Sequence, residues 1–288
     1  MNRCTRWFRR SGWRHLVGII AVTFAIFPVL WVIGVAISKD ASLSSRQLIP
    51  KELSLRNFRR LLTEPGHPEF LRWLFNSVWI GTVTAILQVF LSSLGAFAFS
   101  RLRFKGRRPA MLMLLLVQMF PNLLAIVALF LFMVQLKKLF PAIGIGTDLG
   151  LILIYLGGSM GVNTWLMKGF FDTIPIDLDE AAKIDGATHA QTFFKVILPL
   201  GAPVLAVIGL LSFVASQAEF LFADVIIGPK PKMQTVPSGL SRYVLSGFDN
   251  NWGPFAAGAL IHAVPTVVLF LFLQRFIVEG LTSGAVKG

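Results

Sequence analysis

The stretch EAAKIDGATHAQTFFKVILPL at residues 180–200 decides how this chain is organised. It lies between two strongly apolar segments, yet it begins with an acidic residue and contains Gly186 where a helix would otherwise continue. Asp177 is placed to cap a first helix, and Gly186 is typical of a left-handed helix end. Thr188 followed by Gln191 is the start signal of a second helix. We therefore predict two short helices that meet at Gly186.

The second of these helices carries an apolar stripe on an otherwise polar element. Its members recur at the spacing of one helical face: Ala190, Phe193, Phe194, Ile197 and Leu198. Pro199 marks its end. Two interpretations of the stripe remain open. It packs on the protein's own inner ends or the lipid interface, or it docks a cytoplasmic partner.

Composition places the chain in a membrane. Of its 288 residues 55% are hydrophobic and 14% are charged, whereas about a quarter are charged in an average soluble domain. Cys4 is the only cysteine, so no intrachain disulfide is possible, and no Cys/His spacing suggests a zinc site. The net charge of +13 comes from basic residues at the ends of apolar runs, such as RLRFKGRR at 101–108. That arrangement follows the positive-inside rule and argues against nucleic-acid binding.

Six apolar runs are long enough to cross a bilayer, which takes roughly 20 helical residues. They cover approximately 16–38, 71–100, 110–136, 149–170, 200–227 and 254–278. Pro28, Pro121 and Pro265 fall inside these runs and predict kinks. We predict an all-α membrane protein of six transmembrane helices, with both termini in the cytoplasm and a cytoplasmic loop at 171–199.

The loop also resembles a known family. Glu180, Ala181 and Ala182, followed at the family's intervals by Gly186, Leu198 and Pro199, resemble the EAA loop of ABC-importer permeases, with Val196 where isoleucine is usual. The resemblance extends to WLFNSVWIGT at 73–82, QMFPNLLAIVALF at 118–130, YLGG at 155–158, DGAT at 185–188 and GLTSGAVKG at 280–288. These segments are similar to the smaller, G-type permease subunit of maltose and maltodextrin importers.

The resemblance implies a division into a basic cytoplasmic N-terminus at 1–15, a permease domain at 16–279 and a cytoplasmic tail at 280–288. It implies that the loop couples to a cytoplasmic ATPase dimer through Glu180, Ala181, Ala182, Asp185, Gly186, Phe193, Phe194, Leu198 and Pro199. An outer loop would reach toward an extracytoplasmic sugar-binding protein through Gly228, Pro229, Lys230, Pro231 and Lys232. The tail would contact the ATPase through Gly284, Ala285, Val286, Lys287 and Gly288.

The same resemblance implies a non-catalytic subunit of a prokaryotic inner-membrane importer. ATP would bind the partner subunit, and this chain would hold no cofactor or metal. A larger companion permease would contain the main sugar site, and membrane lipid would surround both.

Polar residues inside the apolar runs are the remaining candidates for a site. Glu219 lies in the fifth run, where a carboxylate is costly, so we predict that it lines the translocation path, with a hydrated helix end as the alternative. Asp224 is expected to be interfacial and His262 structural. Gln88, Gln118 and Asn122 either bind neighbouring helices or contact sugar.

Other functions remain open on the sequence alone. The cargo could be another sugar such as trehalose, or glycerol phosphate. A membrane-embedded enzyme would need titratable groups at one depth, and only Glu219, Asp224 and His262 are candidates. A channel or a secondary carrier would leave the cytoplasmic helix pair without a partner.

Overall fold

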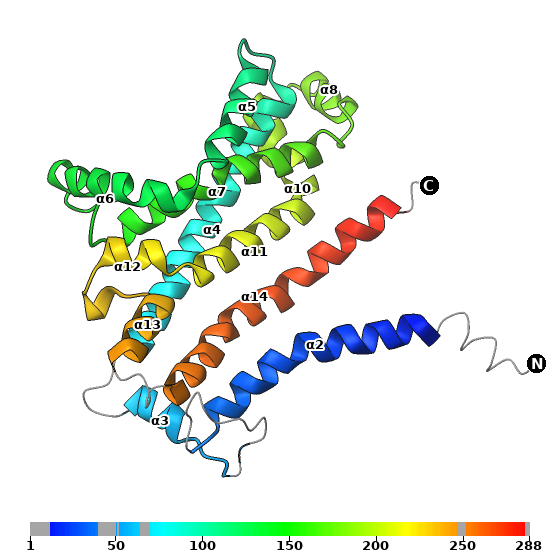
Figure 1. The fold of residues 1–288 in the computed structure, drawn as a ribbon. Helices are drawn as coiled ribbons and strands as arrows, with labels where there is room; N and C mark the ends of the chain where they lie inside the picture. The colour runs from blue at the N-terminus through cyan, green and yellow to red at the C-terminus, as the bar shows by residue number, and fades with distance from the viewer. Residues whose placement is uncertain (1–11, 40–49, 51, 64–68, 247–251, 286–288) are drawn as a thin grey trace, which may run out of the picture. The chain divides into compact units, whose positions relative to one another are not determined.

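The computed structural model describes residues 12–39, 50, 52–63, 69–246 and 252–285, and these residues form helices joined by loops (Figure 1). Within these ranges the pairing of Ser38 with Leu53 is an isolated β-bridge, not part of a strand. Four helices are long and apolar enough to cross a membrane, and the number rises to six if each of two bent helix pairs is one span. The described part of the chain is thus helical, as predicted.

The chain divides into two compact units. The first combines residues 1–70 with 240–263. It contains the long helix α2 (Trp13–Ala36), the short helix α3 (Arg56–Thr63) and the beginning of α14 (Trp252–Ala285). Asn57 of α3 donates hydrogen bonds to the carbonyl oxygens of Ala36 and Ser38 at 2.9 and 2.7 Å, which satisfies carbonyl groups at the C-terminal end of α2.

The second unit combines residues 71–239 with 264–288 and holds most of the helices. In chain order these are α4 (Phe70–Arg101), α5 (Arg107–Gln118), α6 (Asn122–Leu139), α7 (Asp148–Phe171), α8 (Asp177–Ile184), α9 (His189–Thr192), the π-helical turn η2 (Phe193–Ile197), α10 (Leu198–Leu200), α11 (Ala202–Ala218), α12 (Leu221–Ile227), the 3₁₀ turn η3 (Pro231–Met233) and α13 (Val236–Ser246), which continues into the first unit. Two apolar clusters, one around Ile226 and one around Phe171, form its core.

Two of the predicted spans are not single helices. The run at 110–136 is divided between α5 and α6, which meet at an angle of 100°. Pro121 stands at the N-cap of α6 with an extended backbone (ψ 113°). Proline has no N–H to continue the helix and disfavours helical backbone in the residue before it, so the chain breaks there instead of kinking.

The second bent pair is His189–Leu200 with Ala202–Ala218, at 78°. The run at 200–227 is also divided, at a separate break near its C-terminal end. Helix α11 ends at Ala218, Glu219 is extended (ψ 124°), and α12 begins at Leu221. The Glu219 carboxylate accepts hydrogen bonds from the backbone N–H groups of Phe222 and Ala223 at 2.7 and 3.0 Å. A side chain that binds these free N–H groups favours a new helix start over continuation of the old helix.

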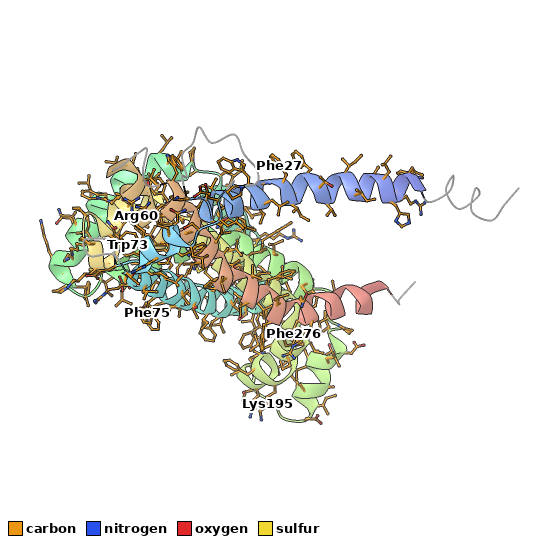
Figure 2. All side chains as sticks on the ribbon, turned by 90° about the horizontal axis from the view of Figure 1, so that it is seen from below. Phe27, Arg60, Trp73, Phe75, Lys195 and Phe276 are labelled. Atoms are coloured by element: carbon orange, nitrogen blue, oxygen red, sulfur yellow. The ribbon has the colours of Figure 1, made fainter. Side chains whose placement is uncertain are left out.

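The long helices present broad apolar surfaces. Phe27 on α2 and Phe75 on α4 both extend away from the ribbon (Figure 2), and both side chains are exposed. Surfaces of this kind are typical of helices that face lipid or another membrane protein.

Candidate functional site

The segment around Gly186 has two helical parts. Helix α8 ends in a Schellman motif, because the N–H of Gly186 donates to the Lys183 carbonyl at 3.0 Å and that of Ala187 donates to the Ala182 carbonyl at 2.9 Å. Gly186 has a φ of +80°, in the left-handed region that side chains disfavour. Apart from its two chain neighbours, no residue has an atom within 4 Å of the position where its Cβ would be, so the backbone angle explains why glycine stands here.

The second part begins at Thr188 with a complete capping box. The Thr188 hydroxyl accepts from the Gln191 N–H at 3.3 Å, and the Gln191 side chain accepts from the Thr188 N–H at 2.8 Å. The prediction for the first part is wrong in one detail. Asp177 is the first helical residue of α8, not its cap, and the cap position belongs to Ile176, which makes no side-chain bond.

The predicted apolar stripe is only half correct. Phe193 and Ile197 are buried against Phe171, whereas Phe194 is 51% exposed. The reason is local geometry, because residues 193–197 form a π-helical turn, which is wider than an α-helical one. The turn directs Phe193 and Ile197 inward and leaves Phe194 outside.

A buried ion pair attaches α8 to the end of α4. Arg101 Nε lies 2.8 Å from Asp179 Oδ2, and the two side chains are 9% and 8% exposed. Arg101 also donates to the carbonyl oxygen of Ile174 at 2.8 Å. Arg101 therefore holds both α8 and the loop before it.

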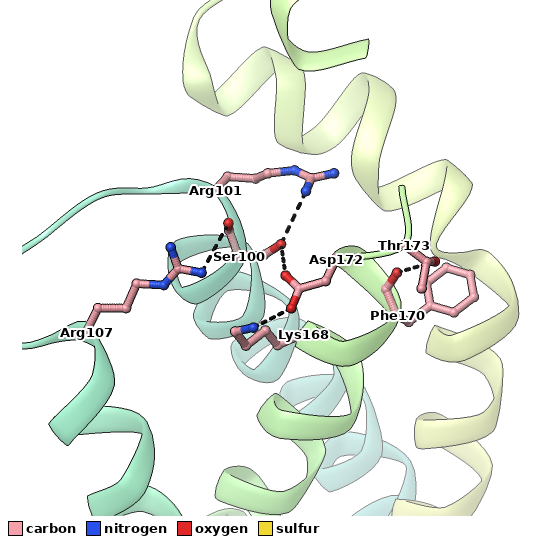
Figure 3. A network of polar contacts seen from close by, with 7 residues as sticks. All are labelled: Ser100, Arg101, Arg107, Lys168, Phe170, Asp172 and Thr173. Carbon is pink, nitrogen blue, oxygen red and sulfur yellow. Dashed lines mark hydrogen bonds and ion pairs between the residues drawn. The ribbon is translucent and has the colours of Figure 1, made fainter. Parts of the chain in front are cut away.

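A second polar group lies beside Arg101 (Figure 3). Asp172, at the end of α7, accepts from Ser100 at 2.7 Å and pairs with Lys168, while Arg107 donates to the Ser100 carbonyl at 3.4 Å. Burial alone would raise the pKa of Asp172, but the hydrogen bonds from Lys168 and Ser100 and the charges of Lys168 and Arg107 outweigh it and lower that pKa. The ends of α4, α5 and α7 are thereby tied together beside α8.

The exposed surface of the same segment carries apolar side chains among charged ones. Ile184 is 87% exposed, and Ile176, Phe194 and Leu200 are exposed as well. We call these four residues the loop patch. Of the predicted coupling residues, Glu180, Ala181, Asp185 and Pro199 are also exposed, and Ala182 and Leu198 are partly buried. The segment is thus fixed to the helix ends on one side and presents apolar side chains on the other.

A second candidate is a cavity of about 830 Å³ in the larger unit. Polar side chains from three helices reach it at spacings of three or four residues, so each helix contributes one polar stripe. These are Thr84 and Gln88 on α4, Tyr155 and Ser159 on α7, and Ser212, Ser216 and Glu219 on α11 and at its end. Gln118 of α5 also lines it, and the rest of the lining consists of aliphatic and aromatic residues and two glycines. We call this space the polar cavity.

Glu219 lines the polar cavity and also shapes its wall. Besides the N–H groups of α12, its carboxylate accepts from the Tyr155 hydroxyl at 2.7 Å. These contacts fix the break between α11 and α12 and join it to α7. Whether Glu219 lies on a translocation path stays a prediction.

The amide residues differ in their contacts. Gln88 is buried, donates to the Tyr155 carbonyl at 2.8 Å and to the Ser159 hydroxyl, and accepts from Asn163 at 3.4 Å. Gln88 thus joins α4 to α7, which is the helix-binding role. Gln118 lies against Gly161, where an added Cβ would be 3.0 Å from the Gln118 amide nitrogen. Asn122 is the first residue of α6.

Sequence reasoning found Gln88, Gln118 and Glu219 but missed the residues that accompany them. The signal was present as polar residues four apart within apolar runs: Thr84 with Gln88, Tyr155 with Ser159, and Ser212 with Ser216. Which of these stripes meet depends on helix packing, so the cavity itself was not visible in the sequence.

The predicted outer loop, residues 228–232, is held by two of its carbonyl groups and by the Lys230 side chain. The Trp73 indole donates to the Pro231 carbonyl at 2.6 Å, and the Asn76 amide donates to that of Lys232 at 3.0 Å. The Lys230 ammonium donates to the Gly146 carbonyl at 3.1 Å, and Gly228 has a φ of +69°. Pro229 and the two lysines remain exposed. A binding protein as the partner of this loop stays a prediction.

The other predicted residues lie apart from these sites. Asp224 accepts from Ser238 at 3.1 Å, and His262 is partly buried within α14. Helix α14 continues to Ala285, so Gly284 and Ala285 of the predicted tail are helical, while Val286, Lys287 and Gly288 lie outside the described residues. Among the described residues no group of three or more His, Cys, Asp or Glu is arranged to hold a metal ion.

Comparison with known proteins connects these features. Residues 88–279 match the family described as the inner membrane component of binding-protein-dependent transport systems. The chain is 39% identical over 285 residues to the maltose/maltodextrin transport system permease protein MalG of Salmonella typhimurium, covering 95% of each chain. It is 37% identical over 283 residues to the galactooligosaccharides transport system permease protein GanQ of Bacillus subtilis, covering 98% of each.

A solved structure shares the fold. The chain superposes on one from a bacterial ABC transporter involved in the import of the acidic polysaccharide alginate, with a TM-score of 0.71 and 24% identity over 96% of this chain and 98% of that one. The family match covers well over half of the chain and both relatives match over nearly their whole length. This protein therefore belongs to the inner membrane components of binding-protein-dependent transport systems.

Proposed function

We propose that this chain is a permease subunit of an ATP-driven importer of uncharged oligosaccharides, with maltose and maltodextrins as the expected cargo. Members of the family are membrane components, so the chain is a non-catalytic subunit of the importer. ATP would bind and be hydrolysed on a cytoplasmic partner dimer. A companion permease and an extracytoplasmic sugar-binding protein would complete the assembly, with both termini of this chain in the cytoplasm.

The observation that carries the ATP-driven part is the construction of the segment around Gly186. Its inner side is fixed to the ends of α4 and α7 by buried contacts, above all the ion pair between Arg101 and Asp179. Its outer side presents the loop patch, in which Ile184 is 87% exposed. Exposed apolar side chains on a firmly attached element favour a docking surface for another protein. A partner that closes on ATP binding would move this surface and, through it, the membrane helices.

The attachment of this segment explains how a partner would act on the membrane helices. A partner shifts an equilibrium between two permease states only by the difference in its contacts with them. The loop patch is the place where such a difference would arise, and the buried ion pair would transmit it to α4.

The cargo is inferred from the relatives. Their names concern maltose or maltodextrin in one case and galactooligosaccharides in the other, at 39% and 37% identity. Both cargoes are uncharged chains of sugar rings. The relatives therefore support an uncharged oligosaccharide as the class of cargo better than they support one particular sugar. Galactooligosaccharides are therefore a second candidate, with trehalose and glycerol phosphate behind them.

The test is affinity purification of the tagged protein from its native membrane beside a Gly186→Trp variant. Co-purifying chains are identified, and ATP hydrolysis and uptake of labelled maltotriose are measured in proteoliposomes. Galactooligosaccharide, trehalose and glycerol phosphate serve as competitors.

We expect the wild type to bring an ATPase and a second permease, and the variant to lose the ATPase or its coupling to sugar. If neither form retains an ATPase under mild extraction while the protein alone conducts solute, the chain is a channel or a carrier. Competition by glycerol phosphate and not by sugars would contradict the proposed cargo.

A further inference from the structure

The polar cavity has the size and lining of a ligand site. Its volume of about 830 Å³ lies within the range of about 300 to 1,000 Å³ that is usual for small-molecule sites. Polar groups from α4, α5, α7 and α11 face into it, although all four helices lie in apolar runs. Polar side chains inside membrane helices are retained mostly for helix binding or for function. Gln88 binds a neighbouring helix through hydrogen bonds, whereas several other polar lining residues make no such bond among the described residues.

Thr84 is the clearest of these residues. Its side chain is 1% exposed and lines the polar cavity, yet its hydroxyl forms no hydrogen bond within the part of the chain that the structure describes. A buried hydroxyl without a partner lowers stability unless a ligand or water meets it. Thr84 therefore leaves one unused hydroxyl in the wall of the cavity.

Two further groups offer capacity for hydrogen bonds. The carboxylate of Glu219 accepts one bond at Oε1 and two at Oε2, whereas a carboxylate has about four acceptor positions. One position on Oε1 is thus left for a hydroxyl donor. Ser216, at the same wall, uses its own hydroxyl hydrogen for the Phe213 carbonyl at 2.6 Å, and its oxygen can accept another bond.

The charge of the lining selects the kind of ligand. Glu219 is the single charged side chain among the described lining residues, and none of those residues is Lys, Arg or His. A phosphate ester or an acidic sugar would meet a carboxylate with no cation to balance it. Phe120, Tyr155 and Phe222 add flat apolar surfaces, which suit the apolar faces of a sugar ring. The lining fits an uncharged, hydroxyl-rich molecule.

We propose that the polar cavity is a binding site for an uncharged oligosaccharide on the import path, so that this chain contacts the cargo directly. Thr84, Gln118 and Ser216 bind sugar hydroxyls, and Glu219 both shapes the wall and accepts a hydroxyl hydrogen bond. The proposal rests on the proposed importer function and goes beyond the resemblance, which places the main sugar site in the companion permease. It also predicts that cargo with a negative charge is disfavoured.

Protection of introduced cysteines tests the site. A Cys4→Ser background removes the only native thiol. Ser216→Cys and Gln118→Cys place thiols on two walls of the cavity, and Thr82→Cys places one on α4 outside it, on an exposed position. The complete importer is held open with a non-hydrolysable ATP analogue and maltotriose-loaded binding protein, and a hydrophilic methanethiosulfonate is added.

We expect maltotriose to slow labelling of the Ser216→Cys and Gln118→Cys variants several-fold and to leave Thr82→Cys unchanged, and glycerol phosphate to protect none. Cavity thiols that react equally fast with and without maltotriose, in an importer that still takes it up, would overturn the site and leave the proposed function intact. Cavity thiols that never react would also overturn it, because the space would be closed to solute. An importer that takes up no uncharged oligosaccharide would refute both proposals.

The Thr84→Val variant adds a readout that a purely structural residue would not produce. Valine has nearly the shape of threonine and lacks the hydroxyl, so loss of the bond to sugar should lower the maximal uptake rate by roughly 3- to 10-fold. Thermal stability of the assembled importer should stay equal or rise, because an unpaired buried hydroxyl has been removed. Thr82→Val is the matched control and should change neither the uptake rate nor the thermal stability. Unchanged uptake by the Thr84→Val variant would contradict the proposal.

Discussion

The buried pair between Arg101 and Asp179 allows the attachment of α8 to be tested quantitatively. The two side chains are 9% and 8% exposed, so solvent and salt screen them little. Removing one partner of such a pair leaves an uncompensated buried charge and costs about 3 to 5 kcal/mol. Replacing both with apolar residues of similar volume is often close to neutral.

The Asp179→Asn and Arg101→Met variants should therefore release α8 from the end of α4. Hydrogen exchange of the α8 amides in the assembled importer reports this local opening directly. A loss of 3 to 5 kcal/mol corresponds to exchange that is faster by a factor on the order of 10² to 10⁴. The Arg101→Met/Asp179→Leu double variant should recover most of the protection, and ATP hydrolysis should become uncoupled from uptake in the single variants only.

Asp177→Asn is the matched control, because Asp177 lies in the same first turn, is exposed and has no ion pair among the described residues. Its loss removes only a favourable interaction with the helix N-terminus, about 0.3 to 1 kcal/mol. Equal exchange rates in the Asp179→Asn and Asp177→Asn variants would refute the reasoning. So would a double variant that exchanges faster than either single variant, since the two losses would then be independent.

Three further predictions concern the same region. Gly186→Ala should destabilise the loop by about 1 kcal/mol, because the φ of +80° at this position is unfavourable for any residue with a Cβ. Gly169→Ala, in a helix with open space around it, should be neutral or stabilising. Equal shifts of the melting temperature in the two variants would contradict this. Thr188→Ala should cost about 1 kcal/mol through loss of the capping box, and unchanged exchange of the amides that follow would argue against it. The lowered pKa of Asp172 predicts that its contribution to stability is present above its unfolded pKa of about 3.9 and is lost as the pH falls through the lower folded pKa. The difference in melting temperature between wild type and Asp172→Asn should therefore be constant near neutral pH and shrink below about pH 4. A difference that already shrinks above about pH 5 would contradict the lowered pKa.

Local signals in the sequence were sufficient wherever one residue governs its own backbone. Gly186 ends α8, and Thr188 with Gln191 begins the next helix, because both effects depend on neighbours within a single turn. The apolar runs predicted helices long enough to cross a membrane for the same reason. The breaks at Pro121 and Glu219 were missed, the first because a proline inside a helix kinks or ends it depending on its surroundings.

The candidate sites required more than local signals. The Arg101–Asp179 pair joins residues 78 positions apart, by the difference of their numbers, and no periodicity connects them. Phe194 was placed on one apolar stripe with Phe193 and Ile197 by α-helical spacing, but in the π-helical turn Phe194 is exposed while the other two are buried. The four-residue spacing of the polar residues is visible in the sequence, but helix packing determines which of these polar stripes face the same cavity.

The sequence by itself thus determined the environment, the helices and the family of this protein, because hydropathy, charge at the helix ends and the EAA spacing are properties of the chain alone. Only the tertiary structure decided which polar side chains share a cavity, which charges become buried partners and which apolar residues stay exposed. The physical reason is that burial and pairing depend on contacts between distant segments, whereas helix formation and its ends depend on residues within one or two turns.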